Sequence, residues 1–429
     1  MSSASRKPSG LSWTPTVPSH WDVANIRRFA QMKTGHTPSR SNPEYWWDCS
    51  IPWFTLADVW QLRDGKRMYI ESTENQISQL GLANSAAELL PERTVVLSRT
   101  ASVGFSGIMK RPMATSQDFW NWVCGPRLLP EFLVYVFRGM RAEFEALMIG
   151  STHKTIYQHV AAAIRIPVPP IEEQQAIADF LDRETIGIDT LTQEQYRLND
   201  MLRERRDAAW AGDLDQIALQ APMIQLRRVI ESIIDGPFGS SLTSAHYVES
   251  GVRVIRLGNI GINEFKNEDM AFISSDYAAT LLAHAVHADD VVVAGLGDER
   301  MPLGRASVVP DIGPAIVKAD CYRIRPTRAI LPSYLAWALS APPTRNQMAL
   351  LARGATRMRL NTSVVREVAI PVPEIETQRQ IVAQSRQQLA KIDTLIAETE
   401  RFIELSKERR AALITAAVTG QIDVRGEAA

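Results

Sequence analysis

Apolar residues recur at alternating steps of three and four positions along two long stretches of the chain, the first ending near Trp210 and the second near Thr419. This spacing is typical of a helix that packs against another helix along one seam. Each stretch predicts a helix of roughly 40 residues, or roughly 60 Å. The predicted seam positions are Ile177, Leu181, Ile188, Leu191, Leu198, Leu202, Ile381, Leu389, Ile392, Ile396 and Ile403. We expect the two helices to pair antiparallel; separate packing on the chain's own domains or on another chain is the alternative.

Each stretch follows a proline-rich segment, IPVPP at 166–170 and IPVPE at 370–374. The prolines exclude helix and predict an extended approach to the helix start. The two copies align without a gap at a constant offset of 204 positions, as between Ile166 and Ile370. That period is too long for a solenoid repeat. It predicts a duplicated domain followed by a duplicated helix.

The regions before each helix share an order of elements. A short buried strand at 94–98 and a helix at 130–137 correspond to a strand at 290–294 and a helix at 332–339. The predicted fold class is α+β, with two similar mixed α/β domains joined by two long helices in an antiparallel coiled coil. The predicted parts are a flexible arm at 1–18, a first domain at 19–165, a helical spacer at 166–215, a second domain at 216–369, a C-terminal helical spacer at 370–420 and a tail at 421–429.

Composition narrows the functional classes. The chain has 429 residues and a formal net charge of −1, so any argument for nucleic-acid binding must rest on local basic patches. Cys49, Cys124 and Cys321 lie far apart, which disfavours a disulfide framework or a zinc site. No signal-peptide pattern and no apolar run of membrane-spanning length is present. These features predict a cytoplasmic protein.

The sequence contains none of the familiar catalytic patterns. GxGxxG after a strand, GxxxxGK[ST], HExxH and GxSxG are all absent. The histidines are scattered and more consistent with structural or surface roles than with a metal site. We therefore expect no catalytic residue and no metal ligand in this chain.

Polar and basic residues gather in loops at matched positions of the two halves. Arginines with amides and hydroxyls are suited to phosphates and base edges. The DNA-binding candidates are Arg99, Thr100, Ser102, Lys110, His153, Lys154 and Thr155 in the first half, and Arg300, Arg305, Arg353, Arg357, Arg359 and Asn361 in the second. The alternative is an ordinary solvated face. The aromatic cluster at 45–54 is better suited to a core or interface than to base stacking.

With both copies laid out, the chain resembles the specificity (S, or HsdS) subunits of type I restriction-modification systems. The resemblance covers almost the whole chain and depends on the order of several short motifs. They are Trp21, GHTPS at 35–39, YW at 45–46, IPW at 51–53, GST at 150–152 and the segment 166–177, then Gly236, GAT at 354–356 and the segment 370–381. The second copy lacks the YW and IPW elements, and EQQ at 173–175 becomes TQR at 377–379.

The resemblance implies two target-recognition domains, each reading one half of a split, asymmetric DNA site. It implies that the paired helices set the spacing and dock two methyltransferase subunits, with restriction and translocase subunits as further partners. S-adenosylmethionine, ATP and Mg would belong to those partners, and this chain would carry no cofactor. Three alternatives stay open: a protein-only coiled-coil scaffold, the specificity subunit of a methylation-only system, and an enzyme with an unrecognised site.

Overall fold

The computed structural model describes residues 5–100, 102–148, 154–298, 301–352 and 358–424. The chain forms two compact units. Unit 1 comprises Met1–Tyr196 with Arg401–Ala429, and unit 2 comprises Arg197–Glu400. Each unit therefore contains one mixed domain and one half of each long helix. The predicted fold class is confirmed.

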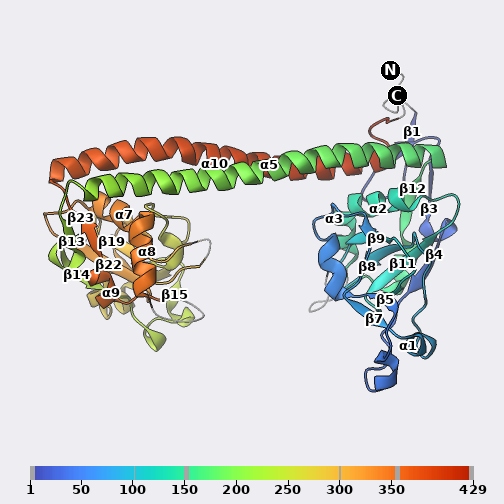
Figure 1. Ribbon diagram of the computed structural model, residues 1–429, viewed down its shortest axis with the longest axis horizontal. Helices are drawn as coiled ribbons and strands as arrows, with labels where there is room; N and C mark the ends of the chain where they lie inside the picture. The colour runs from blue at the N-terminus through green and yellow to red at the C-terminus, as the bar shows by residue number, and fades with distance from the viewer. Residues whose placement is uncertain (1–4, 101, 149–153, 299–300, 353–357, 425–429) are drawn as a thin grey trace. The chain divides into compact units, whose positions relative to one another are not determined.

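Unit 1 is built around a five-stranded sheet in the order β4-β11-β8-β9-β6 and a three-stranded sheet in the order β10-β5-β7 (Figure 1). Its strands are β1 (Arg6–Pro8), β2 (Thr16–Pro18), β3 (Asp22–Asn25), β4 (Ala30–Thr34), β5 (Ile51–Phe54), β6 (Tyr69–Ile70), β7 (Asn75–Ile77), β8 (Val95–Ser98), β9 (Ser106–Met109), β10 (Ala114–Thr115), β11 (Phe119–Cys124) and β12 (Arg165–Val168). Its helices are η1 (Ile26–Arg28), η2 (Pro43–Trp46), η3 (Leu56–Leu62), α1 (Gln79–Ala83), α2 (Pro130–Gly139), α3 (Arg141–Leu147) and α4 (Gln158–Ala163).

Unit 2 repeats this plan with a four-stranded sheet in the order β14-β22-β19-β20 and a five-stranded sheet in the order β15-β17-β16-β21-β18. Its strands are β13 (Met223–Gln225), β14 (Ile230–Ile234), β15 (Tyr247–Val248), β16 (Val252–Ile255), β17 (Phe272–Ile273), β18 (Ala285–Val286), β19 (Val291–Ala294), β20 (Ala306–Val308), β21 (Ala315–Val317), β22 (Cys321–Pro326) and β23 (Ala369–Pro371). Its helices are η4 (Leu226–Arg228), η5 (Gly239–Ser241), η6 (Ser244–His246), η7 (Leu257–Asn259), α6 (Ser275–Ala279), η8 (Leu282–His284), α7 (Pro332–Ser340), α8 (Pro342–Leu351) and α9 (Thr362–Glu367).

The two units share most of their strand pairings. The predicted strands are present as β8 and β19, both fully buried, and the predicted helices as α2 and α7, each with Pro at its first turn. Helix α2 packs on β8 and β9, and α7 packs on β19 and β20. The parallel pair β5–β10 corresponds to the parallel pair β16–β21. These matches confirm the duplicated domain.

The long helices are α5 (Ile171–Ala218) and α10 (Ile375–Val418), and each begins just after its proline-rich segment. A buried glutamine anchors each start. Gln174 Oε1 accepts from the backbone N–H of Leu129 (2.8 Å), and its Nε2 donates to two carbonyls. Gln378, at the offset of 204, makes the same three bonds, with Leu331 as its backbone donor (2.8 Å). The glutamine thus ties the first turn of the long helix to the start of α2 or α7.

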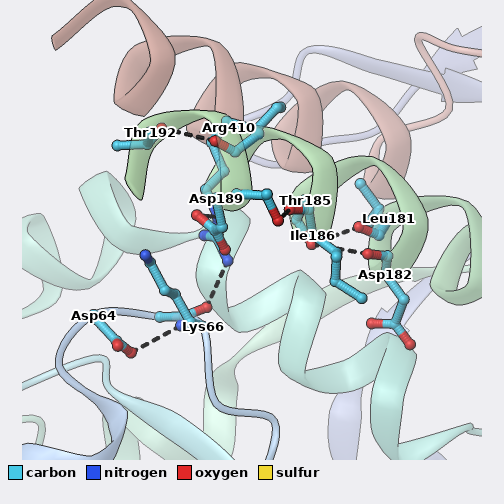
Figure 2. Close-up of polar contacts among 12 residues, drawn as sticks. Asp64, Lys66, Leu181, Asp182, Thr185, Ile186, Asp189, Thr192 and Arg410 are labelled. Atoms are coloured by element: carbon cyan, nitrogen blue, oxygen red, sulfur yellow. Dashed lines mark hydrogen bonds and ion pairs between the residues drawn. The ribbon is translucent and has the colours of Figure 1, made fainter. Parts of the chain in front are cut away.

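Helices α5 and α10 run antiparallel in both units, as predicted. In unit 1, Arg410 pairs with Asp189 at 3.1 Å (Figure 2), and in unit 2, Arg206 pairs with Asp393 at 3.1 Å. The two pairs join equivalent residues, since both partners are related by the offset of 204. In the middle of the pairing, Asn199 Nδ2 donates to Thr399 Oγ1 at 3.0 Å.

The seam differs from the predicted one in α5. Leu191 and Leu198 are 56% and 37% exposed, so their assignment to the seam is wrong. The buried positions next to them are Thr192 and Asn199. The threonine hydroxyl is satisfied by the carbonyl four residues earlier, at 2.7 Å. Of the other predicted seam residues, Ile177, Leu181, Ile188, Leu202, Leu389 and Ile403 are buried, and Ile381, Ile392 and Ile396 are partly buried.

The predicted flexible arm is also wrong for residues 5–18. These residues include the β1–β2 hairpin, and Val17 is fully buried in the core of unit 1. Arg6 donates to the carbonyls of Thr419 (3.3 Å) and Gly420 just after the end of α10. The abundance of Ser, Pro and Gly suggested a loose segment, whereas the hairpin and its contacts with the C-terminal region of the chain order it.

Candidate nucleic-acid interface

The loops that follow β8 and β19 carry the first group of predicted DNA-binding residues. In unit 1, Thr100 forms an isolated antiparallel bridge with Thr155. The Thr155 hydroxyl donates to the Thr100 hydroxyl at 2.9 Å. The loop after β8 and the loop before α4, predicted separately from sequence, therefore lie together. Lys154 is exposed beside this bridge.

An aromatic residue in the centre of the sheet supports the unit 1 loops. Trp120 Nε1 donates to the carbonyl of Ile156 at 3.0 Å, and the N–H of Ile156 donates to the carbonyl of Arg99 at 2.9 Å. The guanidinium of Arg99 lies over the Trp120 ring, 4.4 Å from its centroid. Burial lowers the pKa of Arg99, although an arginine stays charged. The arrangement holds a cation at the edge of the loop pair.

In unit 2, the loop after β19 and the loop before α9 are joined in the same way by different residues. Leu296 forms an isolated bridge with Arg359, the counterpart of Thr155 at the offset of 204. The N–H of Leu360 donates to the carbonyl of Gly295 at 2.9 Å, and the Tyr322 hydroxyl donates to the carbonyl of Leu360. Tyr322 thus takes the place that Trp120 has in unit 1. The backbone contacts between the two loops are the same in both units, whereas the side chains differ.

Arg359 is the best-placed cation of the second loop pair. Its guanidinium bonds Asp320 at 2.6 Å and lies 5.0 Å from the ring centroid of Phe238, which is half exposed. Asp320 also donates its N–H to Asp235 Oδ1 at 2.8 Å. Burial raises the pKa of Asp235 to about 6, and the backbone donors of Gly236 and Asp320 oppose that rise. The guanidinium of Arg359 is still about half exposed, which leaves it accessible to a ligand.

The structure contradicts one candidate. Arg305 is 3% exposed and donates to five backbone carbonyls at 2.6–3.2 Å, including those of Leu257, Ile260 and Leu296. A guanidinium that is buried and bonded in this way holds loops together and is not exposed to contact DNA. The predicted DNA contact at Arg305 is therefore wrong, because the sequence shows a charge but not its burial.

Other candidates have local partners. Lys110 pairs with Glu71 at 2.6 Å, and Asn361 caps α9 by accepting from the N–H of Val364 at 2.8 Å. Ser102 lies in the turn after Thr100, to whose carbonyl its N–H donates at 2.6 Å. His153, Arg300, Arg353 and Arg357 lie outside the described residues.

Sequence analysis missed a pocket beside the unit 1 loops. A cavity of about 400 Å³ is lined by Thr37, Arg40, Trp53, Asn75, Gln117, Asp118 and four neighbouring residues. It borders the loop pair, because the carbonyl of Asp118 accepts from the N–H of Arg99 at 3.0 Å. Thr37 donates to Gln117 at 2.6 Å. The hydroxyl-rich turn at 34–39 was the available signal, but nothing in the sequence linked it to residue 117.

Within the described ranges, no group of three or more His, Cys, Asp or Glu side chains is placed to hold a metal ion. In the same part of the chain, no helix is both long and apolar enough to cross a membrane. The three cysteines are free thiols, and burial raises the pKa of Cys124 and that of Cys321. A raised thiol pKa disfavours the nucleophilic thiolate.

The known proteins to which this chain is similar are specificity subunits of type I restriction enzymes. A family model for the type I restriction modification DNA specificity domain matches residues 18–199. The type I restriction enzyme MjaIX specificity subunit of Methanocaldococcus jannaschii is 30% identical over 190 residues, which is 44% of this chain and 42% of that protein. That match spans less than half of the relative. The MjaVIII specificity subunit of the same organism is 22% identical over 437 residues, covering 95% of this chain and 94% of that protein.

A solved structure shares the fold along nearly the whole chain. It is described as the structural basis underlying complex assembly and conformational transition of the type I R-M system. It matches with a TM-score of 0.66 and 15% identity, and it covers 95% of this chain and 99% of that one. The shared fold therefore includes both domains and both long helices.

Proposed function

We propose, on the premise that the chain belongs to the family of type I restriction-modification specificity subunits, that it selects the DNA sequence on which its partner enzymes act. Each unit reads one half of a bipartite, asymmetric site through its joined loops. The chain itself performs no chemistry, and S-adenosylmethionine, ATP and Mg act on partner subunits. Two methyltransferase subunits dock on the paired helices, and restriction and translocase subunits complete the assembly.

The main observation in support of the proposal is that two polar loops are joined in the same way in both units. In both units an isolated bridge joins the loop after the central strand to the loop before α4 or α9. In both, a ring donor from the neighbouring strand holds the second loop. A retained backbone with divergent side chains is the arrangement expected of two readers of different sequences, because base edges are discriminated by side chains.

The first test measures DNA binding by the chain assembled with its methyltransferase partner. Arg359→Ala should weaken binding and lower the slope of log affinity against log salt by about one unit if the guanidinium contacts a phosphate. If it contacts a base, selectivity in one half-site should relax at a cost of roughly 1–3 kcal/mol. Arg227→Ala is the control, because Arg227 is a half-exposed arginine of unit 2 that pairs with Glu367 at 3.2 Å and belongs neither to the joined loops nor to the long helices. An unchanged affinity and slope for Arg359→Ala would remove this loop from the interface.

The second test concerns spacing. Four residues inserted into both helices, after Tyr196 and after Glu400, lie at the boundary of the two units and avoid both cores. Four residues add roughly 6 Å of helix, close to two base pairs at about 3.4 Å each. We expect the same half-sites with a longer gap between them. An active variant with an unchanged gap would mean that the helices do not set the spacing.

A further inference from the structure

A second cavity lies in unit 1, between the globular domain and the pair of long helices. Its volume is about 490 Å³. It is lined by the loops at 62–66 and 103–106, the junction of α2 and α3, and facing residues of α5 and α10. Figure 2 shows the loop of Asp64 and Lys66 on the side of the helices where Arg410 and Asp189 meet. None of the described loop residues proposed to read DNA lines this cavity.

The charged side chains around the cavity are mostly cations. They are Arg63, Lys66, Arg138, Arg141, Lys407 and Arg410, against the acids Asp64 and Asp189. Asp189 is paired with Arg410 at 3.1 Å, and Asp64 accepts the backbone N–H of Lys66 at 2.9 Å. Lys407 pairs with Glu404 at 2.7 Å. The cavity therefore carries more positive charge than its own carboxylates neutralise.

Arg138 has no carboxylate partner among the described ion pairs. Its guanidinium donates to the carbonyl of Arg67 at 2.8 Å and lies over the Tyr135 ring. Burial is the main cause that lowers the pKa of Arg138 to about 10; the charge of Arg410 acts in the same direction, and Tyr135, Asp182 and Asp64 oppose it. The charges of Arg138 and Arg410 repel each other, and an anion bound beside them would lessen this repulsion.

In unit 2, two arginines near the equivalent place have carboxylate partners. In unit 2, α8 follows α7 as α3 follows α2 in unit 1, and Arg345 of α8 pairs with Asp207 at 3.5 Å. The counterpart of Asp207 in unit 1 is Ala411. Arg141 of α3 and Ala411 both line the unit 1 cavity, so an arginine is present there without this carboxylate.

A second ion pair of unit 2 also has no carboxylate at the equivalent position of unit 1. In unit 2, Arg203 pairs with Glu400 at 2.7 Å. In unit 1 the counterparts are Lys407 and Tyr196, and the ammonium of Lys407 lies 5.8 Å from the centroid of the Tyr196 ring. Asp207 and Glu400 of unit 2 thus correspond to Ala411 and Tyr196 of unit 1. Both Ala411 and Tyr196 line the cavity.

From this difference we propose that the unit 1 cavity binds a small phosphate-bearing anion of the nucleoside polyphosphate class. Clustered guanidinium and ammonium groups suit phosphate oxygens. The rings of Tyr196 and Phe105 and the apolar side chains of Ile188 and Ile414 supply surface for a base. The volume lies within the range of small-molecule sites and has no room for duplex DNA.

The test titrates the full-length chain with ATP, and separately with pyrophosphate, by calorimetry. Wild type should bind ATP saturably. Ala411→Asp and Tyr196→Glu introduce the carboxylates of unit 2 at exposed helix positions, and each should weaken ATP binding about tenfold or more. Arg141→Gln should do the same without adding a negative charge. The matched control is Asp207→Ala in unit 2, which removes a carboxylate from the equivalent place and should leave the affinity unchanged.

Three results would overturn the proposal. The first is the absence of saturable binding of ATP and pyrophosphate to wild type. The second is wild-type affinity in Ala411→Asp and Arg141→Gln. The third is a loss of affinity for duplex DNA in these variants with no binding of either small probe, which would assign the cations to the DNA backbone. Circular dichroism of each variant checks that the helices remain folded.

Discussion

Units 1 and 2 use the same framework and differ in the side chains that it presents. The glutamines at the starts of α5 and α10 make the same three hydrogen bonds. The ring donor that holds the second loop is Trp120 in one unit and Tyr322 in the other. At the joined loops themselves, two hydroxyls in unit 1 correspond to a leucine and an arginine in unit 2. The duplication has therefore kept the groups that position the loops and varied the groups that could contact a ligand.

The largest effect is expected where the two units agree. Gln174→Ala and Gln378→Ala each remove three hydrogen bonds and leave buried backbone groups unsatisfied. Each should lower the free energy of unfolding by about 3 kcal/mol, since every unsatisfied buried group costs about 1–3 kcal/mol. Urea unfolding of the full chain measures the loss. Gln175→Ala, at an exposed neighbouring position, is the control and should change stability by less than about 0.5 kcal/mol. Similar stability of all three variants would show that the glutamines do not anchor the helices.

A smaller effect is expected where the units differ in charge. Arg99→Ala in unit 1 and Arg359→Ala in unit 2 should each relax selectivity in only one half of the DNA site. The expected cost in binding is roughly 1–3 kcal/mol for a base contact. Competition with DNA duplexes altered in one half-site measures it. If either variant relaxed both halves, the division of recognition between the units would be wrong.

The units should also differ in their response to pH. Burial raises the pKa of Asp235 to about 6 from its ordinary value of 3.8, whereas the equivalent position in unit 1 is Thr34, which does not titrate. Between these pH values the folded chain binds more protons than the unfolded chain, so this contribution to stability is lost as pH rises through about 6. Asp235→Asn should raise the free energy of unfolding at pH 7.5 by about 1 kcal/mol, allowing for partial solvent screening.

At a pH below the ordinary value of 3.8, Asp235→Asn and wild type should have the same stability, because the carboxyl is then neutral in both states. Unfolding measured at acidic pH and at pH 7.5 separates the two cases. Asp311→Asn, at an exposed position of unit 2, should show no such difference. A pH-independent effect of Asp235→Asn would mean that the side chain acts through its hydrogen bonds alone.

The smallest effect is expected on the outer face of α5. Leu191→Gln should change stability by less than about 0.5 kcal/mol, because this side chain is exposed. Ile188→Ala, in the buried seam three residues earlier, should cost about 2–4 kcal/mol. Thermal unfolding of both variants checks the position of the seam. Equal losses would restore Leu191 to the seam.

Much of the fold could be predicted because the duplication gives two sequences for the same order of helices and strands. The strands at 94–98 and 290–294, the helices α2 and α7, and both long helices follow from local pattern and proline placement. The phase of the α5 seam did not follow, since polar Thr192 and Asn199 occupy buried positions while leucines occupy the neighbouring exposed ones. Subtracting the offset of 204 from Ile396 and Ile403 gives Thr192 and Asn199. The apolar pattern of the second copy therefore indicates the buried positions of the first copy, where the residues are polar.

The candidate site was less predictable. The two loops could be found as polar segments, but their meeting at Thr100 and Thr155 depends on long-range strand pairing. Arg305 shows the limit of reading charge alone, because a guanidinium that satisfies five carbonyls has the same sequence signature as one that binds phosphate. The order of motifs carried the functional prediction where individual residues could not.

The central claim is that each unit reads its own half of one DNA site while partner subunits perform the chemistry. The direct measurement is sequencing of methylated sites made by the chain with its methyltransferase partner, comparing wild type with Arg359→Ala. The account predicts a bipartite site in which the variant relaxes one half and leaves the other half and the gap unchanged. Relaxation of both halves, or a site without two separate halves, would contradict it.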